Sequence, residues 1–320
     1  MTGSAQSSST SAPVATIIIC TCNRADSLKE TLHALERCEV PATQSVELLV
    51  VDNASRDATP AVVEAFRSTK FDVKYLREKR RGVANARNTG IAAAQAEICI
   101  FVDDDVRPSP QWFQAHLKSF DDPQVSAVQG KLELHFDSTP PAWIEQIHRD
   151  FLAEKNAGDQ RIFPYTQHLA SSNMSFRKRV ALDVGEFCPL LGAGRSGFWE
   201  DSEFSERLMR KGYLQMYLPE AAALHMIPDA RLNAEYYKDA AFRNGISCYM
   251  AEALGTFNNN RRPYRDLIYA NLRHVKMVAK ARLRGERYDC TQDDLFYRMH
   301  MGVTWGYFLG MKRLTRRYSS

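Results

Sequence analysis

The sequence lacks long hydrophobic runs: none of its apolar stretches approaches the roughly 18 to 20 residues that a helix needs to cross a bilayer. Its opening segment, MTGSAQSSSTSAPVA, also lacks the basic and then apolar pattern of a secretory signal. We therefore expect neither a membrane span nor a cleaved leader, and we interpret residues 1–14 as a flexible tail rich in Ser, Thr and Ala.

Paired cysteines are also missing. The seven cysteines are an odd number, scattered along the chain and mostly inside apolar runs. Cys20 and Cys22 have C-x-C spacing, but no second pair accompanies them, which argues against a zinc site. This usage excludes a disulfide scaffold and predicts reduced thiols in a cytoplasmic compartment.

A strong overall charge is missing as well, because 42 Lys and Arg are set against 38 Asp and Glu, for a net charge of +4. The basic character is local: residues 261–287 hold nine Lys or Arg and two acids. Since the remainder of the chain is slightly acidic, the composition does not indicate a nucleic-acid partner.

What the sequence does contain is an alternation of strand and helix patterns in a chain of 320 residues, 44% of them hydrophobic. Short β-branched runs predict strands over 16–20, 46–51, 73–76 and 98–102. The segments between them predict helices: one starting at a Ser27/Glu30 capping box, one over 60–67 with Thr59 as its N-cap, and one over 82–96. The pattern predicts an α/β fold, a mostly parallel sheet flanked by helices on both faces.

The second part of the chain has a different pattern of predicted elements. Strand patterns recur at 125–129, 131–136 and 214–218, and from Tyr236 onward most of the chain has a helical pattern. We expect a tail over 1–14, an α/β domain over 15–230 and a mainly helical C-terminal region over 231–320.

Three consecutive aspartates, Asp103, Asp104 and Asp105, directly follow the predicted strand at 98–102. In an extended strand Asp103 and Asp105 would share one side and Asp104 would face the other. Ligands of open α/β sheets bind beyond the carboxyl ends of the strands, and paired carboxylates there suit Mg²⁺ or Mn²⁺. For this tripeptide alone, a solvated acidic turn is the competing interpretation.

Polar residues also follow the first two predicted strands, so they belong at the same edge of the sheet. They are Thr21, Asn23 and Arg24 after the first strand and Asp52 after the second. A carboxylate at the position of Asp52 can accept the N–H groups of uracil, thymine or guanine. An Asx-type turn before a helix is the commoner reason for such a residue.

The segment that opens the third predicted helix combines a glycine with several cations. It contains Arg81, Gly82, Arg87 and Asn88. The arginines and the helix N-terminus could meet a diphosphate at the sheet edge. A solvated basic turn would show the same pattern.

Farther along, a glycine-rich stretch precedes Glu200 and Asp201, which open another predicted helix. A pliable loop can deliver a carboxylate into a cleft as a general base, whereas acids in a first helical turn also serve simply as dipole partners. His225 follows the predicted strand at 214–218 after an Ala-rich turn. It could complete a metal site begun by the aspartates, or it could be an ordinary structural histidine.

Taken in order, the segments TCNRADSLKETL, VVDNASRDAT, RGVANARNTGIAAAQAEICIFVDDD and WEDSEFSERLMRKGY, followed by His225, resemble the family 2 inverting glycosyltransferases of the GT-A fold. The resemblance covers about residues 14–228. It implies a GT-A catalytic domain over 15–230 that moves a sugar, with inversion, from a nucleotide-sugar donor to an acceptor hydroxyl. UDP is the expected nucleotide, and the expected acceptor is a glycan or a lipid-linked molecule of surface polysaccharide or glycolipid synthesis.

The resemblance also implies roles for the nucleotide-binding residues. Thr21, Asn23 and Arg24 match the first nucleotide-contacting loop, and the segment with Arg81, Gly82, Arg87 and Asn88 joins them at the donor. Asp52 matches the aspartate that reads the base. Asp103 or Asp104 would contact the ribose.

For the chemistry, the resemblance implies a divalent cation, Mn²⁺ or Mg²⁺, on Asp105 with His225 as a further ligand. Asp201 matches the acid that serves as catalytic base, and Glu200 would help orient the acceptor. Residues after about Asp229 match no segment of the family.

Other classes fit the residues less well. A nucleotidyltransferase-like enzyme would need a glycine-rich phosphate loop after the first strand, and TCNRADS contains no glycine. A phosphatase of the D-x-D-x-T or D-x-D-x-V type would not have Arg107 at the fifth place. A non-catalytic nucleotide-sugar-binding module would not need Asp201 after a pliable loop.

The basic segment 262–285 supports a second hypothesis. As a helix it interleaves Leu267, Ile268, Leu272, Val275 and Val278 with arginines and lysines. Such a helix can lie on an anionic membrane, which would place the protein peripherally on the inner face. Alternatively, it is a solvated helix that packs its apolar side on the catalytic domain.

Overall fold

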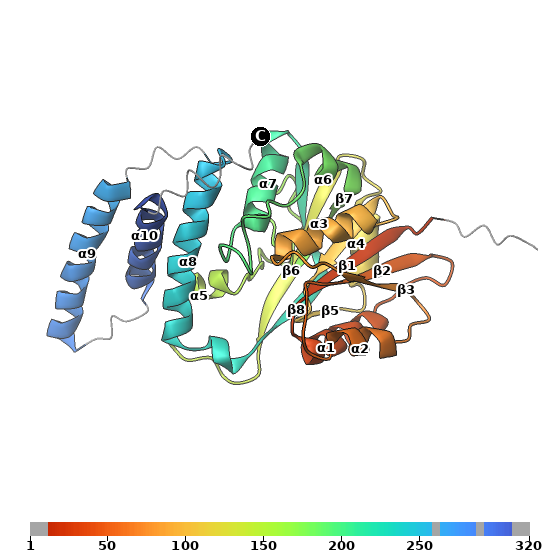
Figure 1. Ribbon diagram of the computed structural model, residues 1–320, viewed down its shortest axis with the longest axis horizontal. Helices are drawn as coiled ribbons and strands as arrows, with labels where there is room; N and C mark the ends of the chain where they lie inside the picture. Colours follow the sequence, from red (N-terminus) through yellow and green to blue (C-terminus); the bar gives the residue numbers. More distant parts are fainter. Residues whose placement is uncertain (1–11, 258–262, 286–290, 309–320) are drawn as a thin grey trace, which may run out of the picture.

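The computed structural model describes residues 12–257, 263–285 and 291–308. Its core is an eight-stranded mixed sheet in the order β3-β2-β1-β4-β7-β6-β8-β5, with helices on both sides (Figure 1). The strands are β1 (Ala15–Thr21), β2 (Val46–Asp52), β3 (Asp72–Arg77), β4 (Ile98–Val102), β5 (Val106–Pro108), β6 (Val125–Phe136), β7 (Asn173–Arg177) and β8 (Leu214–Ile227).

The first half is the parallel α/β unit that the sequence predicts. Strands β3, β2, β1 and β4 run parallel and are connected through α1 (Ala25–Glu36), α2 (Thr59–Ala65) and α3 (Val83–Ala93). Alternate residues of β1 enter different cores: Ile17 and Ile19 pack with α1, while Ile18 packs with α3. Both faces are therefore buried, which explains the continuous apolar runs of these strands.

The second half makes the sheet mixed. β7 pairs antiparallel with β4 and with β6, whereas β6 and β8 run parallel. The two segments predicted at 125–129 and 131–136 form one strand with a register shift beside Gly130. A Cβ atom at Gly130 would lie 2.5 Å from the carbonyl oxygen of Ala221, so only glycine fits this close approach.

Three local predictions were wrong. The capping box at Ser27 does not form, because α1 begins at Ala25 and the Ser27 hydroxyl donates to the backbone oxygen of Asp104 at 2.8 Å. The Ala-rich turn before His225 is instead part of β8, which is long because β6 and β5 both pair with it. Thr59 opens α2 one residue after the N-cap position, where its hydroxyl donates to Asp57.

The remaining helices cover the sheet or lie beside it. They are α4 (Trp112–Ser119), α5 (Gln146–Phe151), α6 (Lys178–Val184), α7 (Glu200–Arg210), the short 3₁₀ helix η1 (Asp229–Arg231), α8 (Ala234–Ala253), α9 (Pro263–Arg284) and α10 (Gln292–Phe308). None of the helices in the described part of the chain is both long and apolar enough to cross a bilayer.

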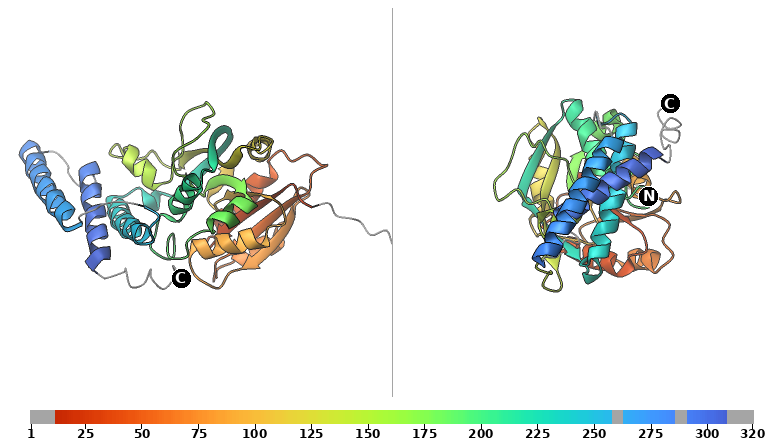
Figure 2. Two further views of the ribbon diagram at one scale, coloured as in Figure 1. Left: turned by 90° about the horizontal axis from the view of Figure 1, so that it is seen from above. Right: turned by 90° about the vertical axis from the view of Figure 1, so that its left-hand side faces the viewer.

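The last three helices form a layer beside the sheet domain, with α10 between α8 and α9 (Figures 1 and 2). The crossing of α8 and α10 is close, since a Cβ atom at Gly245 would lie 2.0 Å from the Met299 carbonyl oxygen. A helical C-terminal extension was predicted, and the structure shows it. The boundary near residue 230 stays a prediction, and residues 1–11 of the predicted tail lie outside the described residues.

Candidate active site

A cavity of about 790 Å³ opens at the carboxyl ends of β1 and β4, between the sheet, the loop before α7 and the start of α8. Its size suits a ligand such as a nucleotide sugar. Most of the residues that the sequence singled out line it. They are Thr21, Asn23, Arg24, Arg81, Gly82, Arg87, Asp103, Asp104, Asp105, Glu200, Asp201 and His225.

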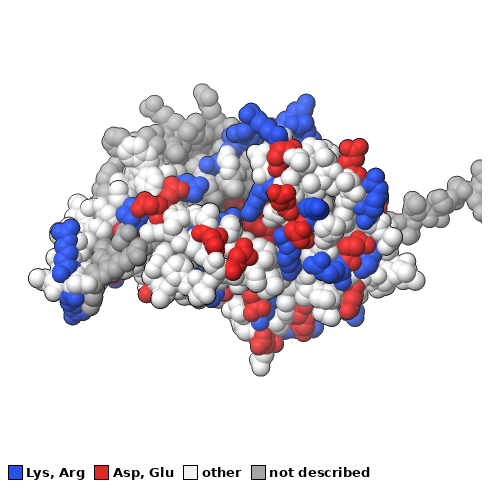
Figure 3. Space-filling model, turned by 90° about the horizontal axis from the view of Figure 1, so that it is seen from below, with Lys and Arg blue, Asp and Glu red and all other residues white. Residues whose placement is uncertain are grey.

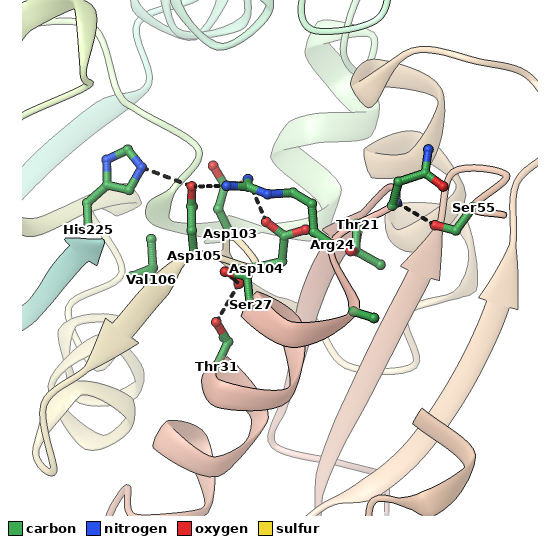
Figure 4. A network of polar contacts seen from close by, with 12 residues as sticks. Thr21, Arg24, Ser27, Thr31, Ser55, Asp103, Asp104, Asp105, Val106 and His225 are labelled. Atoms are coloured by element: carbon green, nitrogen blue, oxygen red, sulfur yellow. Dashed lines mark hydrogen bonds and ion pairs between the residues drawn. The ribbon is translucent and has the colours of Figure 1, made fainter. Parts of the chain in front are cut away.

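The aspartate run leaves the strand, so the predicted alternation of its side chains is wrong. β4 ends at Val102, and the next residues form a turn. Arg24 donates to Asp104 through Nη1 at 2.9 Å and to Asp105 through Nη2 at 2.8 Å, so both carboxylates approach one guanidinium (Figure 4). Asp103 lies apart from this pair and approaches Arg87 at 3.7 Å.

Asp104 ties the end of β4 to β1 and α1. Its carboxylate accepts from the Thr21 hydroxyl at 2.7 Å, and its backbone oxygen accepts from the hydroxyls of Ser27 and Thr31, each at 2.8 Å. Burial raises the pKa of the Asp104 carboxyl to about 7, although Arg24 acts against this shift. Asp104 therefore fixes the turn that presents its two neighbours.

Asp105 faces His225 across the β5–β8 pair. The register sets Val106 opposite His225, which leaves His225 Nε2 3.3 Å from Asp105 Oδ2 (Figure 4). Burial alone would raise the pKa of Asp105, but the hydrogen bond and charge of His225, together with Arg24, hold it below its usual range. His225 Nδ1 lies 2.9 Å from the Leu152 carbonyl oxygen, so Nδ1 carries a hydrogen there.

This pair is chemically suited to a cation. With the hydrogen on Nδ1, Nε2 of a neutral ring and the Asp105 carboxylate are both acceptors, and they require a proton or a metal ion between them. Within the described residues no three His, Cys, Asp or Glu side chains gather as a metal site. Asp105 and His225 offer two ligands, and Mg²⁺ or Mn²⁺ commonly takes its other oxygens from substrate phosphates and water.

Arg87 connects the acid at the helix start to the rest of the site. Its Nη1 donates to Glu200 Oε1 at 2.6 Å, and both side chains are buried. Burial raises the pKa of Glu200, and Asp201 adds to the shift while Arg87 opposes it. The Glu200 carboxylate is therefore paired with Arg87 and positions the Arg87 guanidinium.

Asp201 is held at the same cavity by another segment. Its Oδ2 accepts from the backbone N–H of Ser171 at 3.2 Å and from the Ser171 hydroxyl at 3.4 Å, and Oδ1 accepts from the N–H of Ser202 at 2.8 Å. These donors orient a carboxylate that opens into the cavity. Such an arrangement suits a general base.

Comparison with known proteins identifies the family. A family model described as glycosyl transferase family 2 matches residues 16–185, which is more than half of the chain. The chain belongs to glycosyl transferase family 2. The resemblance stated from the sequence is confirmed. The fold of this chain is the GT-A fold of glycosyltransferases.

Individual proteins resemble this chain in sequence or in fold. The succinoglycan biosynthesis protein ExoM of Rhizobium meliloti is 28% identical over 228 residues, 71% of each chain. The mannosyltransferase PcManGT of Pyrobaculum calidifontis, solved with GDP-Man and Mn²⁺, has a TM-score of 0.58 at 20% identity, covering 97% of this chain and 84% of the other. TarS 1-349 of S. aureus, solved with UDP-GlcNAc, has a TM-score of 0.51 at 19% identity, covering 72% and 66%.

Two predicted nucleotide-binding residues of this glycosyltransferase do not line the cavity. Asp52 is fully buried and accepts from the Tyr75 hydroxyl at 2.6 Å and the Ser55 N–H at 2.8 Å, as in the Asx-type alternative. Asn88 points to the other side of α3, where its side chain exchanges hydrogen bonds of 2.8 and 2.9 Å with the backbone of Phe187. Asn88 is thus a structural residue, and a nucleotide base could reach Asp52 only if Tyr75 moved.

Several residues of the cavity wall were not among the site residues predicted from the sequence. Ser171, in the loop before β7, orients Asp201. Burial lowers the pKa of Lys155, and the nearby charge of Asp201 opposes this shift. Trp199 adopts a left-handed backbone conformation, φ 79°, and contacts Phe257 edge to face. Arg231 approaches Asp105 at 3.7 Å from η1. These residues lie in loops or in the short helix η1, where the local pattern carries no periodicity, so only the folded chain shows their place in the cavity.

Proposed function

We propose that this family 2 glycosyltransferase moves a sugar from a nucleotide-sugar donor to an acceptor hydroxyl with inversion at the anomeric carbon. The observation that carries the proposal is the shared cavity: the acid cluster after β4 and Asp201 of α7 open into the same space of about 790 Å³. A donor diphosphate and an acceptor hydroxyl have to meet in one such space for a direct displacement.

In this proposal Asp201 is the catalytic base. Its carboxylate takes the proton of the acceptor hydroxyl while that oxygen bonds to the anomeric carbon and the bond from that carbon to the diphosphate oxygen breaks. Attack from the face opposite the diphosphate gives inversion in a single step. Ser171 holds Oδ2 from one side, so the carboxylate is oriented before the acceptor arrives.

Cationic side chains line the cavity where the leaving diphosphate would lie. Arg24, Arg81 and Arg87 line the cavity together with the N-terminal end of α3. Their charges would stabilise the negative charge that develops on the leaving oxygen. A divalent ion, Mn²⁺ or Mg²⁺, bound by Asp105 and His225 would supply further neutralisation of the same diphosphate. The Mn²⁺ in the PcManGT complex supports the use of a divalent ion.

For the donor, we propose a nucleoside diphosphate sugar, with UDP-linked sugars as the first to test. The structures of related fold hold UDP-GlcNAc and GDP-Man, which supports the donor class. Thr21, Asn23 and Arg24 would contact the nucleotide, with Asp103, the most open of the three aspartates, at the ribose.

For the acceptor, the wall around Asp201 suggests a glycan or a lipid-linked molecule. Aromatic side chains that suit the faces of sugar rings stand beside cations that suit a phosphate. They are Phe151, Phe198, Trp199, Tyr236, Lys155 and Arg243. The relative ExoM is a succinoglycan biosynthesis protein, which supports a place for this chain in polysaccharide synthesis.

The experiment is a thermal-shift screen of nucleotide sugars with and without Mn²⁺, followed by a product assay with the donors that bind. A donor at 100 times its dissociation constant stabilises the folded state by about 2.7 kcal/mol. We expect a bound donor to be slowly hydrolysed and, with a matching acceptor, to yield a product of inverted anomeric configuration by NMR. A donor that binds but is never cleaved would favour a non-catalytic binding module, and a retained configuration would refute the single displacement.

A further inference from the structure

The helix α9 lies at the end of the molecule farthest from the sheet and packs against α10 (Figure 2). Its inner side includes Met277 and Val278, which are half-buried, and Ala281, which is buried. His274 stacks on Tyr297 of α10 at 4.2 Å between ring centroids. The side of α9 that faces the rest of the protein is therefore already occupied, and the sheet domain is not its partner.

A second apolar stripe runs along the outer side of the same helix. Ile268, Leu272, Val275 and Leu283 are spaced by four, three and eight residues, which keeps them on one face. They are 60%, 65%, 65% and 88% exposed. Four large apolar side chains in line on one exposed face are more than the scattered single residues that any surface shows.

Cations border this stripe. The helix carries six Lys or Arg and a single acid, Asp266. Asp266 is half-buried, and its spacing of eleven residues from Met277 puts it on the inner side of the helix. Arg273 pairs with Asp293 of α10 at 2.6 Å. In the described part of the chain no ionic partner is found for Arg265, Lys276, Lys280 or Arg282. Figure 3 shows Lys and Arg side chains beside uncharged surface at this end of the molecule.

We propose that the outer stripe of α9 docks on an anionic lipid bilayer, with Ile268, Leu272, Val275 and Leu283 inserted at the interface. An apolar stripe flanked by unpaired cations matches the boundary between acyl chains and anionic headgroups. A second copy of the chain fits less well, because two such helices face to face would bring like charges together along the contact. The inference goes beyond the proposed sugar transfer and does not depend on it.

The test is co-sedimentation of the full chain with vesicles of phosphatidylcholine alone and of phosphatidylcholine with 30% phosphatidylglycerol, about a third of the lipid being anionic. We expect binding to the anionic vesicles only. The double variant Lys276→Glu/Lys280→Glu should bind them roughly 25-fold more weakly, from about fivefold for each cation lost. Its control, Lys29→Glu/Lys79→Glu, makes the same change of charge at exposed lysines of the sheet domain and should bind as the wild type does.

A second pair of double variants tests the contribution of the apolar side chains to vesicle binding at constant charge. Leu272→Gln/Val275→Gln should weaken vesicle binding by roughly tenfold or more. Leu182→Gln/Leu214→Gln, also at exposed positions, should leave it unchanged. All four residues are exposed, so thermal unfolding midpoints should stay near the wild type.

Three results would overturn the proposal. The first is no binding of the wild type to anionic vesicles. The second is equal weakening by Lys276→Glu/Lys280→Glu and by its lysine control, which would show that net charge alone acts. The third is a dimer, seen by analytical ultracentrifugation, that Leu272→Gln/Val275→Gln dissociates without affecting vesicle binding. None of these readouts uses a sugar donor, so they separate failure of this inference from failure of the proposed function.

Discussion

The guanidinium of Arg87 donates to the carboxylate of Glu200 at 2.6 Å, joining segments 113 residues apart along the chain. Burial alone would lower the pKa of Arg87, but the charges of Glu200 and Asp103 raise it above its ordinary value. The same arginine stacks over the Phe187 ring with 5.5 Å to the centroid. One buried cation therefore holds the acids from the end of β4 and the start of α7 around a common cavity.

Replacing this cation should destabilise the fold. Arg87→Met leaves Glu200 buried without a partner, which costs about 3 to 5 kcal/mol when one member of a buried pair is removed. The free energy of unfolding in urea measures the loss. As a control, Lys211→Met removes a half-exposed partner of Asp183 and should cost less than about 1 kcal/mol. The double variant Arg87→Met/Glu200→Gln should recover much of the loss, and equal costs for Arg87→Met and Lys211→Met would contradict the assignment.

Removing the proposed base should affect turnover rather than donor binding. Asp201→Asn keeps the size and the hydrogen bonds from Ser171 but cannot take the acceptor proton, so kcat should fall roughly 10²-fold or more. Initial rates with saturating donor measure this, and the donor thermal shift should persist. Glu206→Gln removes a carboxylate from the same helix outside the cavity and should leave kcat near normal. Near-normal turnover of Asp201→Asn would exclude it as the base.

Metal dependence should reside in the Asp105 and His225 pair. We expect Mn²⁺ to increase the thermal shift that a donor produces, and EDTA to remove the increase. His225→Ala should weaken the Mn²⁺ effect at least roughly tenfold, because a ligand contributes no less than the outer partners that support it. His135→Ala, an exposed histidine on the neighbouring strand opposite Met226, is the matched control. A donor response that does not depend on Mn²⁺ would argue against the site.

Acid should destabilise the protein partly through His116, which does not line the cavity. Its ring is buried between Asn173 and Ser175, and burial lowers its pKa from 6.5 to about 4. The unfolded chain takes up this proton at higher pH than the folded one. The stabilisation is therefore complete above pH 6.5 and is lost as the pH falls toward 4, by about 3 kcal/mol in all.

The variant His116→Gln isolates this contribution. Its unfolding free energy should change less than that of the wild type between pH 6.5 and 4, measured by urea unfolding at several pH values. The exposed His33→Gln should retain the wild-type pH slope. Parallel slopes for wild type and His116→Gln would show that another group accounts for the acid sensitivity.

Local sequence patterns were sufficient to predict the strands in the first half of the chain. The strand predicted at 98–102 matches β4, and the other three predicted strands fall within β1, β2 and β3. Buried parallel strands are short apolar runs bounded by polar residues, so their sequence shows both their type and their ends. The position of the aspartate run at the sheet edge followed from this order.

Predictions failed where a tertiary contact competed with a local one. Ser27 has the spacing of a helix cap, yet its hydroxyl bonds to the backbone of Asp104. The alanines before His225 have low strand propensity, yet pairing with β5 and β6 extends β8 through them. Asp52 stands at the end of a strand as predicted, but Tyr75 from the neighbouring strand covers it.

The sequence by itself determined the family, the parallel half of the sheet and the edge at which the acids and arginines gather, because these depend on short-range periodicity and order along the chain. Only the tertiary structure decided the partner of each charge: Arg24 between Asp104 and Asp105, Arg87 with Glu200, and His225 opposite Asp105. Those partners are 80 to 120 residues apart in the chain. The choice among them depends on strand register and burial, which no local pattern encodes.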